Sequence, residues 1–417
     1  MADRVHDQSR LGWLDGLRGF AAMQVVLMHY VFAFLPAVAM TYPLPVGELG
    51  AAGLAGIPLV YAFDGSSAVY LFFLMSGVVL TQAFSSRTFR VPSAVMRRLI
   101  RLGLPMIAAT LFAGALLALL PDAHLAAGER TGSTALRDIG PTVISLYSIA
   151  HQIIFEGLLT GFSTWSLLPR WTLHYITLSP RVQGFNVPLW TLHIEFCGSL
   201  LVMLLVVVRS AASQGAYRAV CAILGFAFVI SPMSLFVIGH LAASQIKYAR
   251  ERRPLAVPGS ILLGAGVLLC SIRTTVPIAM LWTWLPAPPI GIQGDAASLQ
   301  KMIGAVSIFA GLACLPALQR YLEQPFPRWI GKISFSLYLT HYPILYTAVA
   351  LVFNGAIEVL PYDVSIAVVG VAGIVITITT AVLFERWVDR PSIALSRTVA
   401  SRFSDPALSS PLKPVAG

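Results

Sequence analysis

Ionisable side chains are rare inside apolar stretches, and three of those found there in this sequence could take part in chemistry. His29 ends the run Leu14–Tyr30, Glu195 lies near the start of a second stretch, and His341 lies in a third. A carboxylate beside an imidazole fixes the ring's tautomer and raises its basicity, and such a ring can take a proton from a hydroxyl. We therefore expect His29 and Glu195 to form a catalytic pair. The alternative is a structural pair that holds two helices together.

Arginines form a second candidate group. Arg18 precedes His29 by eleven positions, a helical rise of about 16 Å. Arg101 follows Arg98 by three positions and Arg97 by four, which are helical spacings. Arginine suits phosphate, so these residues could clamp the phosphates of a ligand. The equally weighted alternative is that they only mark a cytoplasmic loop.

The elements that position these groups are membrane helices. Of the 417 residues, 57% are hydrophobic and 11% are charged, against about 25% charged in soluble domains. Long apolar runs recur along the chain, which predicts an all-α, polytopic membrane bundle. The net charge of +10 comes from basic residues beside the apolar runs, so we expect contact with anionic lipid and no nucleic-acid partner.

We expect about ten spans with both termini in the cytoplasm of a multi-pass cell-membrane protein. With this topology, twenty-one of the 28 lysines and arginines lie on the cytoplasmic side and six on the outer side, as the positive-inside rule requires. The expected spans are residues 13–35, 66–84, 97–120, 186–208, 217–231, 233–247, 255–272, 302–319, 331–353 and 363–385.

One membrane domain, residues 11–390, is predicted between a short cytoplasmic lead, 1–10, and a cytoplasmic tail, 391–417. An extracytoplasmic segment, 121–185, contains an apolar stretch at 141–160 that we expect to be interfacial or re-entrant. Aromatic residues in or beside this segment predict an interfacial belt or, less strongly, a platform for an acceptor sugar; they are Trp165, Trp171, Tyr175 and Trp190.

The remaining histidines are expected to have lesser roles. His341 should line the same cavity as His29, with Pro343 freeing a backbone carbonyl nearby. His193 is expected to be an interfacial polar group, and His240 a satisfied core histidine. The four cysteines lie singly, and no nucleotide-binding or metalloprotease motif occurs, so we predict no metal site and no permanently bound cofactor.

Six short motifs occur in an order that resembles the acyltransferase-3 family of integral-membrane O-acyltransferases. They are Leu14–Gly19 with His29, Phe72–Gly77, Arg97–Arg101, Trp190–Leu192 with Glu195, Ser336–Leu339 with His341 and Pro343, and Phe384–Arg386. The resemblance implies ten spans, an acyl-CoA co-substrate on the cytoplasmic side, and transfer of the acyl group to a hydroxyl of an exported or cell-surface glycan. It also implies that Arg18 and His29 are essential. Two acidic positions of the family hold Tyr70 and Phe196 here, so the roles of those acids do not carry over.

The hypothesis that unites these features is acetyl transfer from acetyl-CoA. Arg97, Arg98, Arg101 and Arg18 would hold the phosphates, and His29, oriented by Glu195, would deprotonate the acceptor. We expect the substrates to contact the residues around this pair, namely His341, Tyr338, Asp15 and Trp190. An acyl-histidine relay, a small natural product as acceptor, a secondary transporter and a silent scaffold are the alternatives.

Overall fold

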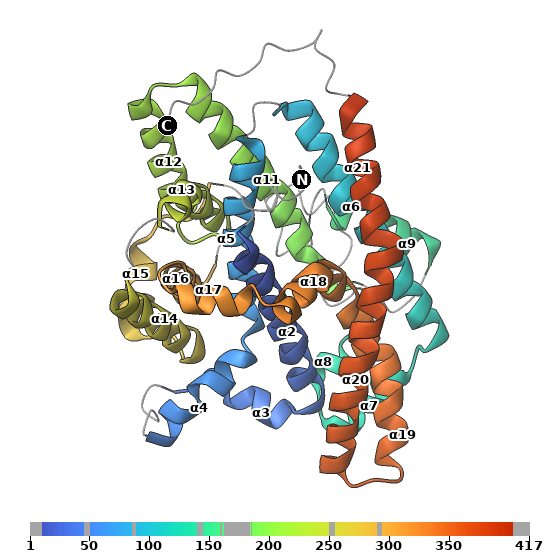
Figure 1. Cartoon of the computed structure of the whole chain (residues 1–417). Helices are drawn as coiled ribbons and strands as arrows, with labels where there is room; N and C mark the ends of the chain where they lie inside the picture. Colours follow the sequence, from blue (N-terminus) through green and yellow to red (C-terminus); the bar gives the residue numbers. More distant parts are fainter. Residues whose placement is uncertain are drawn as a thin grey trace.

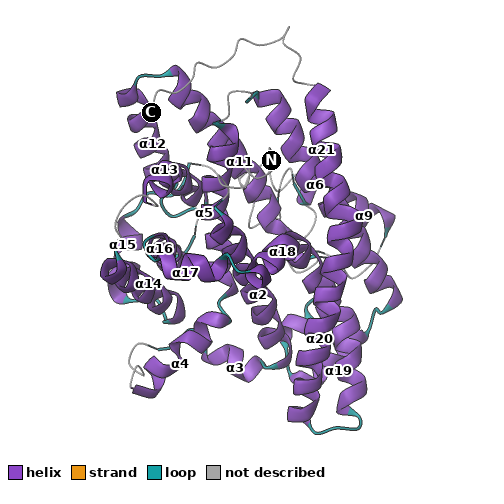
Figure 2. Ribbon diagram, in the orientation of Figure 1, coloured by secondary structure: helices purple, strands orange, loops and turns teal. Residues whose placement is uncertain are grey.

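The structure, a computed structural model, describes residues 11–45, 51–85, 89–139, 145–158, 161, 184, 186–249, 255–289 and 294–402. These residues form helices joined by short connections, and no strand occurs among them (Figure 2). The predicted all-helical class is confirmed. The lead, the tail beyond Arg402 and three of the four outer aromatics (Trp165, Trp171 and Tyr175) lie outside the described residues.

Seven helical segments in the described part of the chain are long and apolar enough to cross a membrane. They are α2 (Gly12–Phe34), α5 (Gly65–Phe84), α6 (Val91–Leu119), the segment Val187–Ala211 that contains α11 (Trp190–Ala211), α16 (Ala296–Ala313), the segment Pro325–Ile357 that begins with α18 (Pro325–Ile344), and the segment Tyr362–Arg402 that begins with α20 (Tyr362–Phe384). Shorter apolar helices lie within α13 (Met233–Ala249) and at α14 (Ala256–Ser271), and α12 (Gln214–Ala227) precedes them. Each predicted span therefore falls on a helix, while the count of ten and the side of the termini stay predictions.

The first span lies at the centre of the arrangement. In Figure 1, α2 runs between α5, α18 and α20, and it packs closely on α18 and α5. The contact with α18 has no room for side chains. A β carbon at Gly331 would collide with the backbone oxygen of Asp15, and one at Gly19 would collide with the backbone nitrogen of Gly331. These glycines let the backbones approach, as small residues do between membrane helices.

The second-last and last spans continue past their α-helical parts through π-helical turns. After α18, η5 (Leu345–Val349) leads into α19 (Ala350–Ile357), and after α20, η6 (Glu385–Asp389) leads into α21 (Arg390–Arg402). The helix therefore extends through Arg402, well into the segment that we assigned to the tail.

A backbone carbonyl of α18 that lacks its helical hydrogen bond determines where the fourth span begins. Pro343 has no amide hydrogen, so the carbonyl of Leu339, four residues earlier, lacks its helical partner. The side-chain amide of Asn186 donates to that carbonyl at 2.7 Å. Asn186 is fully buried and immediately precedes the 3-10 turn η4 (Val187–Leu189) and α11. The fourth span thus begins deep in the protein, beside the middle of the segment Pro325–Ile357.

The stretch that we expected to be interfacial or re-entrant holds two short helical pieces, α9 (Leu146–His151) and η2 (Gln152–Glu156). They pack against α6, and Leu158 joins a core cluster with Met106 and Leu192. Their combined length is well short of the ~20 residues of a full span. Whether they enter the membrane stays a prediction.

Replacing Gly331 by alanine is expected to destabilise the protein, because the added methyl group must push α2 away from α18. Overpacking of this kind costs about 1–3 kcal/mol. The measurement is the melting temperature in detergent. Gly264→Ala is the matched control, since this exposed helical glycine has nothing within 4 Å of the added carbon. Equal melting temperatures for the two variants would contradict the close approach of α2 and α18.

Candidate active site

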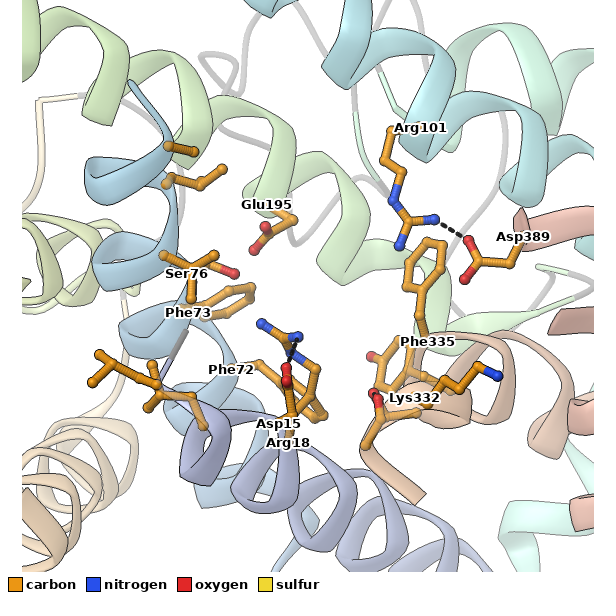
Figure 3. Close-up of a pocket in the computed structure, with 18 of the residues that line it drawn as sticks. Asp15, Arg18, Phe72, Phe73, Ser76, Arg101, Glu195, Lys332, Phe335 and Asp389 are labelled. Atoms are coloured by element: carbon orange, nitrogen blue, oxygen red, sulfur yellow. Dashed lines mark hydrogen bonds and ion pairs between the residues drawn. The ribbon is translucent and has the colours of Figure 1, made fainter. Parts of the chain in front are cut away.

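A large cavity lies among α2, α5, α6, α11 and α18, and the parts of α2, α6 and α18 that line it are the ends that the predicted topology places toward the cytoplasm. Its volume is about 1670 Å³, larger than the ~300–1,000 Å³ of typical small-ligand pockets. Aromatic rings form part of its wall, as Figure 3 shows for Phe72, Phe73 and Phe335. Its charged lining residues are Asp15, Arg18, Arg98, Arg101, Glu195, Glu323, Arg328, Lys332 and Asp389. The cavity therefore combines apolar walls with a dense set of charges.

Three of the four arginines that we expected to bind phosphate line this cavity, and each is paired with a carboxylate. Arg98 donates to Glu195 at 2.6 Å, Arg101 pairs with Asp389, and Arg18 lies 3.5 Å from Asp15. Figure 3 shows the last two pairs on opposite sides of the cavity.

These arginines keep donors for a further anion. A guanidinium has five N–H donors, so one carboxylate does not exhaust it. The Nε of Arg98 is buried and has no hydrogen-bond partner among the described residues. Arg101 also stacks over Phe335, with its guanidinium carbon 5.2 Å from the ring centre.

The prediction that Arg97 belongs to the same group is not supported by its position. Arg97 is exposed and does not line the cavity. Adjacent residues on a helix point about 100° apart, so Arg97 points away from the cavity that Arg98 lines. Spacing to Arg101 alone could not show which of the two neighbours faces inward.

The predicted pairing of His29 with Glu195 is wrong. The Glu195 carboxylate pairs with Arg98 and lines the cavity, whereas His29 does not line it. The half-buried ring of His29 lies instead against α18, with its centre 5.2 Å from that of His341 and 5.0 Å from that of Tyr342. His341 lies beside His29, as expected, but neither histidine is among the residues that line the cavity.

The error in the pairing comes from the depth of α11. The depth of Glu195 depends on where α11 begins, and this helix begins at the level of Leu339 in α18, where Asn186 anchors it. Thr191 donates to the hydroxyl of Tyr338 at 2.9 Å, and Glu195 lies one turn farther along α11. His341 lies about one turn from Tyr338 in the outward direction of α18. The carboxylate and the imidazole therefore lie on opposite sides of Tyr338.

Tyr338 separates the cavity from the two histidines. It lines the cavity, its ring meets Phe72 edge-on with 6.1 Å between centres, and its other neighbour is His341 at 5.8 Å. Its hydroxyl donates to the carbonyl of Pro188 at 2.9 Å. A ligand that extends from the cavity toward His29 must pass this Tyr338–Phe72 pair.

The other predicted residues have mixed outcomes. Asp15 lines the cavity, but Trp190 packs edge-on against Phe73 and does not. His193 is buried and bonds to the carbonyl of Leu158 at 3.0 Å, so the expected interfacial position is wrong. The satisfied core position of His240 is confirmed, since its two nitrogens meet the hydroxyls of Thr81 and Tyr217 at 2.9 and 2.8 Å.

Sequence reasoning missed several residues of the site. Lys332 and Asp389 line the cavity but belong to stretches that we treated only as topology markers. Asn186 was missed because the sequence does not show that its amide bonds to the carbonyl of Leu339, which Pro343 leaves without a helical partner. Within the described residues, no group of three histidine, cysteine or acidic side chains could hold a metal ion.

A buried ion pair beside the site joins α5 to α16. Asp64 is fully buried, caps the start of α5, and accepts a hydrogen bond from Lys301 at 2.8 Å. Lys301 also donates to the hydroxyl of Tyr42 at 2.6 Å. Burial and the Asp64 carboxylate hold the pKa of Tyr42 well above its usual value. We read this cluster as structural, because its charges are paired within the protein.

Comparison with known proteins agrees with the motifs. An acyltransferase domain model matches residues 11–386. The chain is 22% identical over 435 aligned positions to the O-acetyltransferase PaAT-1 of Phomopsis amygdali, covering 94% of this chain and 84% of that protein. No solved structure matches. The protein is a membrane-embedded acyltransferase, and the match over nearly its whole length shows that it belongs to this acyltransferase family.

Proposed function

We propose that this acyltransferase moves an acetyl group from acetyl-CoA to a hydroxyl of an exported or cell-surface glycan, at the cell membrane. Acetyl-CoA is a co-substrate in this proposal and not a permanently bound cofactor. The name of the similar Phomopsis amygdali protein, an O-acetyltransferase, supports acetyl transfer. The glycan rests on the resemblance described above, and a small natural product with a free hydroxyl is the alternative acceptor.

The proposal rests on the position of the cavity, which the aromatic pair Tyr338–Phe72 separates from the histidines His29 and His341. Its arginines offer donors to the phosphates of CoA, and its aromatic walls offer apolar surface to the rest of the molecule. Arg18 and His29 lie on the same helix, about 16 Å apart along its axis. An extended pantetheine arm could follow α2 over that distance and bring the thioester past Tyr338.

The reaction then needs one base. His29 takes the proton of the acceptor hydroxyl, and the oxygen attacks the thioester carbonyl. The carbon–sulfur bond breaks, and the departing CoA thiolate receives the proton from His29. An acyl-histidine relay remains the alternative route, with the imidazole of His29 as the nucleophile. Family membership disfavours the secondary transporter and the silent scaffold.

Replacing Arg98 by alanine is expected to weaken the binding of acetyl-CoA. Loss of a charge-assisted hydrogen bond is worth about 1.5–3 kcal/mol, so the Kd should rise about 10–100-fold. Thermal stabilisation of the detergent-solubilised protein by acetyl-CoA measures this.

The matched control is Arg97→Ala, on the neighbouring residue that does not line the cavity, and its Kd should stay at the wild-type value. Because Arg98→Ala leaves Glu195 unpaired, the double variant Arg98→Ala/Glu195→Ala checks that the loss is not one of folding. If Arg97→Ala weakens binding as much as Arg98→Ala does, the cavity is not the CoA site.

His29→Ala is expected to abolish transfer and to leave acetyl-CoA binding intact, because the base lies outside the cavity that holds the phosphates. The assay is mass spectrometry of O-acetylated surface glycans from a deletion strain that carries either the wild-type or the variant gene. Glycans that remain acetylated at the wild-type level with His29→Ala would remove His29 from the mechanism. Glycans that are equally acetylated in the deletion strain and its parent would remove the glycan as acceptor.

A further inference from the structure

In the His341 ring, one nitrogen is hydrogen-bonded and the other has no hydrogen-bond partner among the described residues. The ring is fully buried, and its Nδ1 donates to the backbone carbonyls of Tyr338 at 2.8 Å and Leu337 at 3.1 Å. Two carbonyl acceptors place the proton on Nδ1, so Nε2 carries a lone pair in the neutral ring. This Nε2 is buried and has no hydrogen-bond partner among the described residues. An unsatisfied buried acceptor costs about 1–3 kcal/mol, so a donor is expected in the working state.

His29 is the donor in the right place. The two ring centres are 5.2 Å apart and the rings are inclined by 37°. The nitrogens lie at the ring edges, so facing nitrogens at this separation can come within about 3 Å of each other. No bond joins the rings in the described structure. The terminal torsion of histidine is broad, however, so a turn of the His29 ring about that torsion is cheap. The Tyr338 hydroxyl, another nearby donor, is already bonded to Pro188.

We propose that His341 is a positioning residue whose Nε2 accepts a hydrogen bond from the ring N–H of His29. This bond leaves the second nitrogen of His29 unprotonated and ready for the acceptor hydroxyl. A base oriented by a third group is a recurring arrangement in enzymes. His341 thus fills the role that the sequence suggested for Glu195. The inference rests on the proposed function, in which His29 is the base.

The proton balance is simple. The O–H bond of the acceptor breaks, its proton goes to the free nitrogen of His29, and its oxygen forms the new bond to the acyl carbon. The positive charge that forms on His29 is stabilised by the lone pair of His341, which stays neutral throughout. When the carbon–sulfur bond breaks, the CoA thiolate takes the proton and His29 returns to its starting state.

The test compares His341→Ala with His341→Gln, which keeps an oxygen able to accept a hydrogen bond. The readout is transfer of labelled acetyl groups from acetyl-CoA to the endogenous acceptor in membranes of a complemented deletion strain. Loss of an orienting partner typically costs 10–100-fold. We expect His341→Ala to lower the turnover rate by that factor with an unchanged Kd for acetyl-CoA, and His341→Gln to recover part of the rate.

The matched control is Thr340→Val, on the buried neighbour whose hydroxyl donates to the carbonyl of Ser336 in its own helix and to no other group in the described part of the chain. It should keep the wild-type rate. Wild-type turnover in His341→Ala would overturn the inference, and so would a loss of acetyl-CoA binding in that variant. If both His341 variants are as inactive as His29→Ala, His341 is itself the base and the inference is also overturned. Activity in His29→Ala is a separate result, which would remove the proposed function instead.

Discussion

The hydrogen bond between Asn186 and the carbonyl of Leu339 determines how the site is divided. Pro343 deprives that carbonyl of its helical partner, and an unpaired backbone group inside a membrane protein is costly. Asn186 supplies the missing donor and thereby fixes the start of α11 beside the middle of the segment Pro325–Ile357. The fourth span is consequently anchored at a buried point and not at the outer water interface.

Two compartments follow from this anchor. On the predicted cytoplasmic side, Glu195 meets Arg98 in a cavity whose arginines are suited to phosphate. On the other side of Tyr338, His29 and His341 face each other between α2 and α18. The close contact of α2 with α18 fixes the two compartments relative to each other, because both helices contribute residues to both compartments.

Much of this arrangement could be predicted from the sequence. Apolar length located the helices, and the positions of His29 and His341 within two spans indicated a shared environment. The pairing of Glu195 could not be predicted, because the depth of a residue depends on where its helix starts, and Asn186 sets that start through a tertiary contact. The position of Arg97 outside the cavity could not be predicted either, since helical spacing relates residues to one another but not to the direction of a cavity.

The central claim is that a ligand held by the cavity arginines reaches His29 past Tyr338. A structure determined in lipid nanodiscs with a non-hydrolysable thioether analogue of acetyl-CoA tests it most directly. The account predicts the phosphates beside Arg98 and Arg101, and the sulfur next to His29 beyond a displaced Tyr338–Phe72 pair. An analogue that ends in the cavity with its sulfur beside Glu195, or a His29 that faces lipid, would contradict it.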